Sequence, residues 1–416
     1  MRVSTDCQGF VVTYIRVQTR NEARDRDGGG CHRERELRSQ NDNNLTIARQ
    51  RVDTPWQQLP QHGAMGYTSY RPPFRIRRRF YTVALLVAAC LVARYATAQN
   101  TPLISGGVGF ITITNGGNTT YLPVLSPLLA APIGSHLLVE SRATLIESFF
   151  PKGGGQAGYT SAPFLNLTFL QGDYLATPHL TIVGGEFLTP FGTYNERLSP
   201  IWIGNFADGP LILPLGTMGT DSSVGGMLRG SAVSTQKFSI DYAAYFSATS
   251  TNPQFNAERS SGGRAAIFFP NAGVEIGTSY GRLLQGTHEN FSGFHVWWEP
   301  ADSPFKLRSE YAHGPHSQGY WVETDYRLSR FGGPDSAIGR LEPIFRMQQT
   351  FRNSPDPSDS LPSADTQRAD FGLDYHLPHE VRINTSYSRQ FSSAGNRNVW
   401  ETGIVYRFLF PTWKGK

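Results

Sequence analysis

Charged side chains recur at alternate positions of extended, otherwise apolar segments, and they are the residues of this chain whose types and spacing could do chemistry. In segment 304–311, Lys306, Arg308 and Glu310 alternate with large apolar residues, and segment 320–328 repeats the pattern. Successive side chains of a β-strand point to opposite faces, so each segment places its charges on one face. A face of this kind can attract, repel or bind ions.

Strand parity predicts which charges share that face. The predicted basic members are Arg142, Arg264, Arg308, Arg327, Arg346, Arg382 and Arg407. The predicted acidic members are Glu140, Asp241, Glu275, Glu310, Glu323, Asp325, Glu342, Asp370, Asp374 and Glu401. Charges of one sign would select ions, whereas mixed signs give either a transverse field or ion pairs that stiffen the structure. Because arginine far outnumbers lysine from residue 99 onward, rigid bidentate pairing is favoured.

The elements that position these charges are short β-strands. Alternating segments of about ten residues recur from residue 135 onward, separated by turn residues and longer polar stretches. The clearest segments are residues 136–146, 237–246, 272–282, 304–311, 320–328, 370–376, 381–387 and 400–410. Turn signals such as Gly332-Gly333-Pro334 lie between them. No segment of useful length has helical periodicity, so the chain is predicted to be all-β.

The last segment indicates which all-β architecture applies. Trp400, Ile404 and Tyr406 lie on one face of it, and Glu401 and Arg407 lie on the other. A strand with one large apolar face and one polar face is what a transmembrane β-barrel needs. In a soluble β-sandwich or β-solenoid, the charged face would be buried in a core at a high free-energy cost. The sequence therefore predicts an antiparallel transmembrane β-barrel whose charged face lines the lumen.

The predicted barrel has 14–16 strands. Fourteen candidates lie in residues 135–410, and two weaker ones, at 106–114 and 120–129, would raise the number to 16. An even number is expected in bacterial barrels, and we favour 16. Prolines 123, 127 and 132 disfavour regular pairing in the second weak candidate. The predicted organisation is an N-terminal segment at 99–134, a barrel at 135–410 and a tail at 411–416.

An export signal is predicted before the barrel. A cluster of arginines that begins at Arg75 precedes the apolar run 80–93, and a small-residue cleavage pattern ends at Ala98. Residues 65–98 are therefore predicted to be a signal peptide, with the mature chain beginning at Gln99. The run is too short for a transmembrane helix, which needs about 18 or more apolar residues. A lipoprotein box at Cys90 is disfavoured by the apolar residues that follow it.

Residues 1–64 have no hydrophobic periodicity, so they are either a spurious extension upstream of a start at Met65 or a disordered segment removed with the signal. The basic pI of about 9.1 belongs to residues 1–98, which hold 16 arginines and 8 acidic residues. The remainder has a net charge of −3, which gives no reason to expect nucleic acid as a partner. Cys7, Cys31 and Cys90 all precede the cleavage site, which excludes thiol catalysis and disulfides in the mature chain.

The longest stretch without alternation, residues 188–226, is the candidate functional loop. Long loops inside compact folds are usually functional or disordered, and the apolar run Ile201-Trp202-Ile203 argues against disorder. One interpretation is that the loop folds into the lumen and narrows a pore, with Glu196 and Arg197 near the constriction. The other is an extracellular loop packed over the barrel rim.

Short motifs carry a family resemblance. Residues 184–192 read Gly-Gly-Glu-Phe-Leu-Thr-Pro-Phe-Gly, and Tyr-Asn-Glu-Arg follows at 194–197. These motifs, together with segment 341–346, resemble elements of bacterial porins, and the nearest group is the phosphate-selective porin O/P-like family. The terminal strand resembles the C-terminal signature of bacterial outer-membrane proteins. The resemblance implies a 16-stranded homotrimeric channel whose anion selectivity depends on lumenal arginines and lysines.

These features predict a porin for passive diffusion of small hydrophilic solutes or ions. It would lie in the outer membrane of a Gram-negative-type bacterium, among outer-membrane lipids, after insertion by the barrel-assembly machinery. The first alternative is a barrel that does not conduct, because it is plugged by 188–226 or serves as an anchor. A soluble secreted β-protein is the second.

Enzymatic and metal-dependent functions find little support in the sequence. His313 and His316 lie near Glu310, but two histidines beside a Gly-Pro turn are more typical of a solvated loop than of a metal site. No phosphate-binding glycine loop or nucleophile elbow occurs from residue 99 onward. The chain is therefore predicted to have no catalytic residues, no metal and no cofactor.

Overall fold

The computed structural model describes residues 102–152, 157–212, 222–250, 259–286, 288–354 and 361–411. The predicted extension, the predicted export signal and most of the predicted tail lie outside these residues. The described residues form 16 strands, as predicted. They are β1 (Leu103–Asn115), β2 (Asn118–Ile133), β3 (Leu137–Pro151), β4 (Tyr159–Thr177), β5 (Leu180–Leu188), β6 (Ser222–Ser234), β7 (Ser239–Ser250), β8 (Ser260–Phe269), β9 (Val274–Leu283), β10 (Asn290–Trp298), β11 (Phe305–His313), β12 (Ser317–Tyr326), β13 (Leu341–Arg352), β14 (Thr366–Leu377), β15 (Val381–Ser392) and β16 (Arg397–Pro411).

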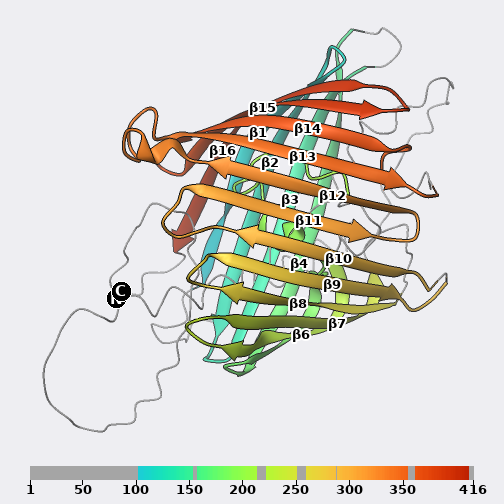
Figure 1. Cartoon of the computed structure of the whole chain (residues 1–416), viewed down its shortest axis with the longest axis vertical. Helices are drawn as coiled ribbons and strands as arrows, with labels where there is room; N and C mark the ends of the chain where they lie inside the picture. Colours follow the sequence, from blue (N-terminus) through green and yellow to red (C-terminus); the bar gives the residue numbers. More distant parts are fainter. Residues whose placement is uncertain are drawn as a thin grey trace, which may run out of the picture.

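The strands close into one barrel in which each strand pairs antiparallel with its neighbours in the sequence (Figure 1). The seam is made by β1 and β16, whose register runs from Leu103 opposite Pro411 to Asn115 opposite Val399. Closure gives the backbone groups of both terminal strands a partner, which an open sheet cannot do. We call the end where β1 begins and β16 ends the termini end, and the opposite end the loop end.

The two faces of the barrel differ as the alternation predicts. On β16, Trp400, Ile404 and Phe410 are 57%, 47% and 56% exposed, and similarly exposed large apolar side chains occur on strands all around the barrel. The alternate positions are buried and many are charged, among them Glu323 and Asp370. An outward apolar face and an inward polar face are the pattern of a barrel that crosses a membrane.

The two weak candidate strands are regular members of the barrel. β2 pairs with β1 without interruption from Asn118 to Ala130, whereas its pairing with β3 is interrupted at Pro123 and Pro127, so the predicted effect of the prolines is seen on one side of the strand only. The pairs between β2 and β3 include Tyr121 with Phe149 and Val124 with Ile146 but skip Pro123 and Pro127. A proline lacks only its own N–H, so it interrupts the ladder on one side of a strand and leaves the other side intact.

One predicted inward residue lies beyond the strands. β12 ends at Tyr326, and Arg327 precedes the short 3-10 helix η2 (Leu328–Arg330) in the turn that leads to β13. Its guanidinium donates to the carbonyl of Gly339 in that turn, at 3.3 Å. The parity argument placed Arg327 on the inner wall because it extended the strand past its end.

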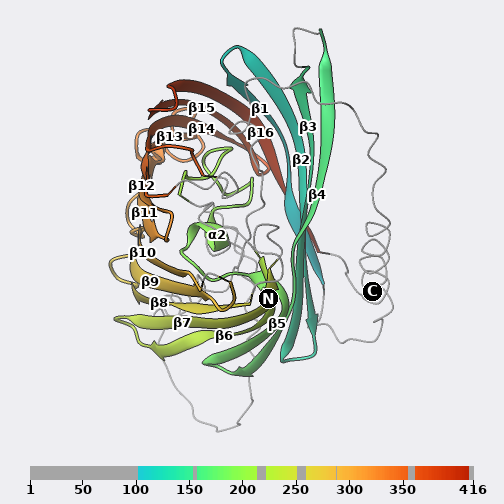
Figure 2. The same cartoon turned by 90° about the vertical axis from the view of Figure 1, so that its right-hand side faces the viewer.

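The segment between β5 and β6 contains the one α-helical turn of the described residues, α2 (Tyr194–Arg197). Figure 2 shows α2 inside the ring of strands. Of the two interpretations of the 188–226 loop, folding into the barrel is therefore correct for residues 189–212, which we call the inner loop. Residues 213–221 are outside the described part. No helix among the described residues is long and apolar enough to span a membrane.

Candidate functional site

The inner loop starts at the loop end of β5, where the hydroxyl of Thr189 lies 2.8 Å from that of Ser223 on β6. Glu310 on β11 then holds the start of α2. One of its carboxylate oxygens accepts hydrogen bonds from the backbone N–H and the hydroxyl of Thr193 and from the N–H of Tyr194, the last at 2.7 Å. These N–H groups have no partner within the helical turn, so Glu310 supplies the acceptor that the helix start needs.

Glu196 and Arg197, the two predicted constriction residues, lie inside the barrel and are each paired with its wall. Arg197 donates to both carboxylate oxygens of Glu275 on β9, at 2.9 and 2.8 Å. Glu196 forms an ion pair with Arg264 on β8. Because each charge is matched by a wall residue of opposite sign, the pairs fix the helical turn in place. Their role at a constriction stays a prediction.

Two wall arginines hold the next part of the inner loop by different means. Arg382 on β15 donates to the carbonyls of Ile201, Ile203 and Gly204, at 3.2, 3.4 and 2.5 Å, and also pairs with Asp374 at 3.2 Å. One guanidinium thus ties three loop carbonyls and a wall carboxylate. Its planar array of donors suits this arrangement.

Arg142 on β3 is only 2% exposed and has no carboxylate partner among the described residues. Its contacts are the hydroxyl of Ser199, at 3.4 Å, and the ring of Phe169, 5.8 Å from the guanidinium carbon. A buried cation without a counterion is unfavourable, so this position is held by packing between the wall and the loop rather than by charge.

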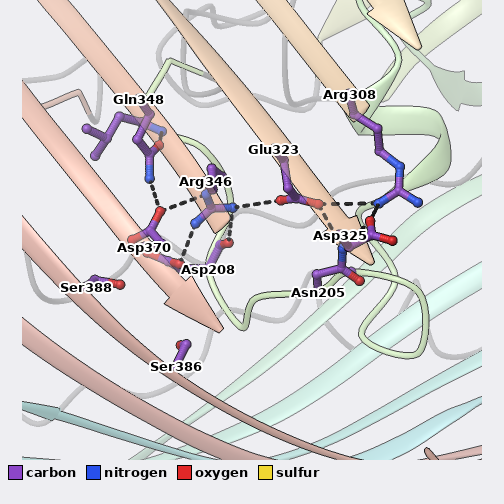
Figure 3. Close-up of polar contacts among 12 residues, drawn as sticks. Asn205, Asp208, Arg308, Glu323, Asp325, Arg346, Gln348, Asp370, Ser386 and Ser388 are labelled. Carbon is purple, nitrogen blue, oxygen red and sulfur yellow. Dashed lines mark hydrogen bonds and ion pairs between the residues drawn. The ribbon is translucent and has the colours of Figure 1, made fainter. Parts of the chain in front are cut away.

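Figure 3 shows the densest ionic contact between loop and wall, on β12 to β14. The carboxylate of Asp208 pairs with Arg346 at 3.1 Å and with Arg368, and both arginines also pair with Asp370, at 2.8 and 2.6 Å. The ring of Phe206 lies 4.3 Å from the guanidinium carbon of Arg346. The loop therefore contributes an aromatic ring and a carboxylate that bridges two wall arginines.

A second network begins beside the first. Arg308 on β11 pairs with Glu299, Asp325 and Glu323, at 2.7, 2.9 and 3.4 Å. The side-chain amide of Asn205, in the inner loop, donates to the two β12 carboxylates at 3.0 and 3.2 Å. The loop thus supplies donors where the wall is acidic and an acceptor where it is basic.

Further charged residues lie on the wall away from the inner loop. On β3, β4 and β6, Gln171 donates to Glu140 and to Asp173, and Asp173 pairs with Arg229 at 2.7 Å. Other contacts of charged residues include Glu342 with Lys306 at 3.1 Å and with His376 at 2.5 Å, Glu401 with Ser386 at 3.2 Å, Asp241 with Ser239 at 3.3 Å, and Arg407 with Glu380 at 3.8 Å. The pairing of charges on the wall is therefore extensive, with both signs present.

Two apolar clusters join the inner loop to opposite sides of the barrel. Its residues Phe191, Tyr194, Leu198 and Ile212 belong to a buried cluster with wall residues of β5 to β7 and β9 to β12, including Trp321. Its residues Ile201 and Ala207 pack on the other side against Ile111, Leu122 and Val124 of β1 and β2, Ile146 of β3, and their neighbours. The inner loop thus crosses the lumen and contacts facing walls.

Sequence reasoning missed several of these residues. Asp173, Arg229 and Arg368 lie on strands, so a complete parity count would have found them. Asn205 and Asp208 lie in the inner loop, where no periodicity signals which charges will meet the wall. No group of three or more histidine, cysteine, aspartate or glutamate side chains in the described part of the chain could hold a metal ion.

Comparison with known proteins adds to this geometry. No family model matches the chain, and no curated protein matches its sequence. Among solved structures it is similar to Salmonella typhi OmpF in complex with daunomycin, with 14% sequence identity, a TM-score of 0.51, and 74% of this chain and 98% of that chain covered. The barrel has a porin fold.

Two other similar structures differ more from this barrel. The anion-selective porin from Comamonas acidovorans has 10% identity and a TM-score of 0.45, over 74% of this chain and 99% of that one. Pseudomonas aeruginosa OpdQ has 11% identity and a TM-score of 0.43, over 76% and 100%. At this level of identity the similarity to OmpF establishes the architecture, and the solute must be argued from the residues of this chain.

Proposed function

We propose that this chain is an outer-membrane porin that lets small hydrophilic solutes or ions diffuse through a water-filled lumen. The observation that carries the proposal is the closed 16-stranded barrel of porin fold with apolar residues facing outward and paired charges facing inward. Such a barrel is stable only where its outer face meets lipid. Inward charges of both signs suit a lumen that water and solutes enter.

A plugged barrel is the second candidate, and a specific observation favours it. The inner loop contacts facing walls through ion pairs and through two apolar clusters, so it fills part of the lumen along its whole path. A barrel closed by such a loop would serve as an anchor or as a scaffold. The two candidates differ in one measurable property, which is the flow of ions.

Planar-bilayer recording of the purified protein under a KCl gradient tests the proposal. Discrete conductance steps are expected, and the sign of the reversal potential would report whether acidic or basic lumenal residues dominate. A folded, inserted barrel that gives no steps would contradict the channel and support the plug. Folding is checked separately by the change in electrophoretic mobility between heated and unheated samples, so a failed insertion is not mistaken for a closed pore.

The proposal also covers solute selectivity and assembly, the two properties that the resemblance to phosphate-selective porins implies. A phosphate-selective channel would be blocked by millimolar phosphate in a chloride solution, whereas a general porin would not. A homotrimer, surrounded by outer-membrane lipid and inserted by the barrel-assembly machinery, is the assembly we propose. The close mixture of arginines and carboxylates on the wall supports weak selectivity rather than a strong preference for one sign.

A further inference from the structure

The wall of the barrel has a step between β4 and β5. β4 pairs with β3 over residues 159–174, whereas β5 pairs with β4 only over residues 170–177. Figure 2 shows β3 and β4 continuing past the end of β5. No other described strand takes the place of β5 beyond that point. Residues 159–167 of β4, which we call the free edge, therefore have a partner strand on one side only.

Alternate residues of the free edge direct their backbone groups to the open side. The carbonyl of Ala143 on β3 points to β2, where it accepts a hydrogen bond from the hydroxyl of Ser126 at 3.2 Å. Ala143 is paired with Leu167, and the residues of such a non-hydrogen-bonded pair direct their N–H and C=O away from each other. The backbone groups of Leu167 therefore point away from β3. Strand alternation extends this direction to Leu165, Pro163, Ser161 and Tyr159.

Part of the free edge lies within the apolar outer band of the barrel. Leu165 is 52% exposed. It stands in a row with three other exposed apolar side chains, those of Leu145, Leu125 and Val108 on β3, β2 and β1. Such a row faces lipid in a transmembrane barrel, and backbone groups without a partner are strongly unfavourable there. The sheet is therefore incomplete at this edge without a further strand.

A carboxylate beside the free edge has no partner either. Glu147 of β3 is paired with Pro163 of the edge. It lies on the outward side of β3, between the exposed Leu145 and Phe149, and no described residue forms a hydrogen bond or an ion pair with it. Glu147, Pro163 and Leu165 line one hollow of about 410 Å³ in the outer surface. The hollow gives a long basic side chain an apolar path from the free edge, over Pro163, to the carboxylate.

We propose that the free edge binds an extended segment of another protein as an added strand, with an arginine or lysine of that segment paired to Glu147. Addition of a strand to a sheet edge is a recurring mode of peptide recognition. The residue opposite Pro163 carries the positive charge, because two strand spacings, about 10 Å, separate it from Glu147. Apolar side chains of the segment lie beside Leu165, since paired residues share a face. The inference rests on the membrane location in the proposed function and not on conduction.

A peptide of matching pattern tests the proposal. The probe is Val-Thr-Val-Thr-Arg-Thr-Val-Thr-Val with a fluorescent label, in which the valines and the arginine are opposite the residues of the edge that point to the open side. The full-length protein, folded in phosphatidylcholine vesicles, is titrated while the anisotropy of the label is measured. We expect saturable binding that weakens by about tenfold or more when the valine and arginine amides are N-methylated, because these amides donate to the edge. The protein is unchanged in this comparison, so its folding cannot confuse the result.

Exchange of the charges tests the contact with Glu147. Glu147→Arg should weaken binding of the arginine peptide by about tenfold and should favour a peptide with glutamate at the centre, because like charges across an interface repel. Arg282→Glu, at an exposed position of β9 far from β4 around the wall, is the matched control and should leave both affinities unchanged. Folding of each variant is checked by the mobility shift on heating.

A cysteine cross-link locates the peptide. Ser161→Cys on the free edge should form a disulfide with a peptide in which cysteine replaces the third valine, which lies opposite that position. Val233→Cys, at an exposed position of β6, should not.

Absence of binding to the wild-type protein would overturn the proposal, whether the edge is held by a second copy, by another part of this chain or by lipid. Binding that survives N-methylation, or a cross-link at both positions, would do the same. Bilayer conductance is scored independently, so failure of the channel and failure of the edge site are distinguishable.

Discussion

At the scale of single residues, the lumen is organised by reciprocal charge pairs. Arg197 of the inner loop pairs with Glu275 of the wall, whereas Glu196 of the loop pairs with Arg264 of the wall. Two neighbouring loop residues of opposite charge thus each pair with a wall residue that carries the complementary charge. This crossed arrangement fixes the orientation of the helical turn, because a rotated turn would bring like charges together.

Removing one residue of such a charge pair should change the ion current through the channel. Arg197→Ala is expected to raise conductance and to shift the reversal potential toward cation preference, because Glu275 loses its cationic partner and the guanidinium no longer occupies the lumen. Single-channel recording of the variant beside wild type measures both quantities. Arg282→Ala, at an exposed position on the same strand as Glu275, is the control. If Arg197→Ala had the conductance and selectivity of wild type, a role of Arg197 at the constriction would be refuted.

At the scale of elements, the inner loop depends on the wall at its start. Glu310 accepts three hydrogen bonds from Thr193 and Tyr194, and the helical turn that follows is too short to be stable alone. The sequence predicted the strands well, because alternation is a local signal that repeats. The sequence did not decide whether the 188–226 loop folds into the lumen or packs over the rim, because contacts such as that of Asp208 with Arg346 join residues far apart in sequence.

Replacing this acceptor should loosen the loop. Glu310→Ala leaves buried donors without a partner, at about 1–3 kcal/mol each, so we expect noisier channel current and faster tryptic cleavage after Arg197. Glu310→Gln keeps one acceptor oxygen and should show a smaller effect. Glu380→Ala, in an exposed turn, should match wild type. Equal cleavage rates in all three variants would mean that the cap does not hold the loop.

At the scale of the whole molecule, the barrel has its polar side inside. The sequence predicted this inversion from the aromatic terminal strand and from the recurring charged faces, and counting the repeats predicted 14–16 strands, with 16 favoured. Arg327 was misplaced because parity says nothing about where a strand ends. The contact partners of the charges were not predictable, since they depend on the curvature and tilt that bring distant strands together.

Substitutions on the outer face test whether the apolar side of the barrel faces lipid. Phe371→Arg, at a 55% exposed outward position of β14, should destabilise the barrel in lipid by about 2–4 kcal/mol, because arginine is unfavourable near the bilayer midplane. Phe331→Arg, at a 69% exposed turn position, should change stability by less than about 0.5 kcal/mol. Urea unfolding in phospholipid vesicles measures both. Equal stability of the two variants would argue for a barrel surrounded by water.

The course of the inner loop also determines how the molecule can be assembled. Trp202 packs against Gly107 of β1, and Arg382 of β15 holds the neighbouring carbonyls, so the loop touches both sides of the β1–β16 seam. These contacts can all form only when β1 and β15 lie on either side of the closed seam. Formation of the loop contacts is thus coupled to closure of the seam, and both join residues far apart in sequence, at a high cost in loop-closure entropy. Substitutions that weaken the loop's contacts with β1 and β15 would then slow closure of the barrel as well as change transport.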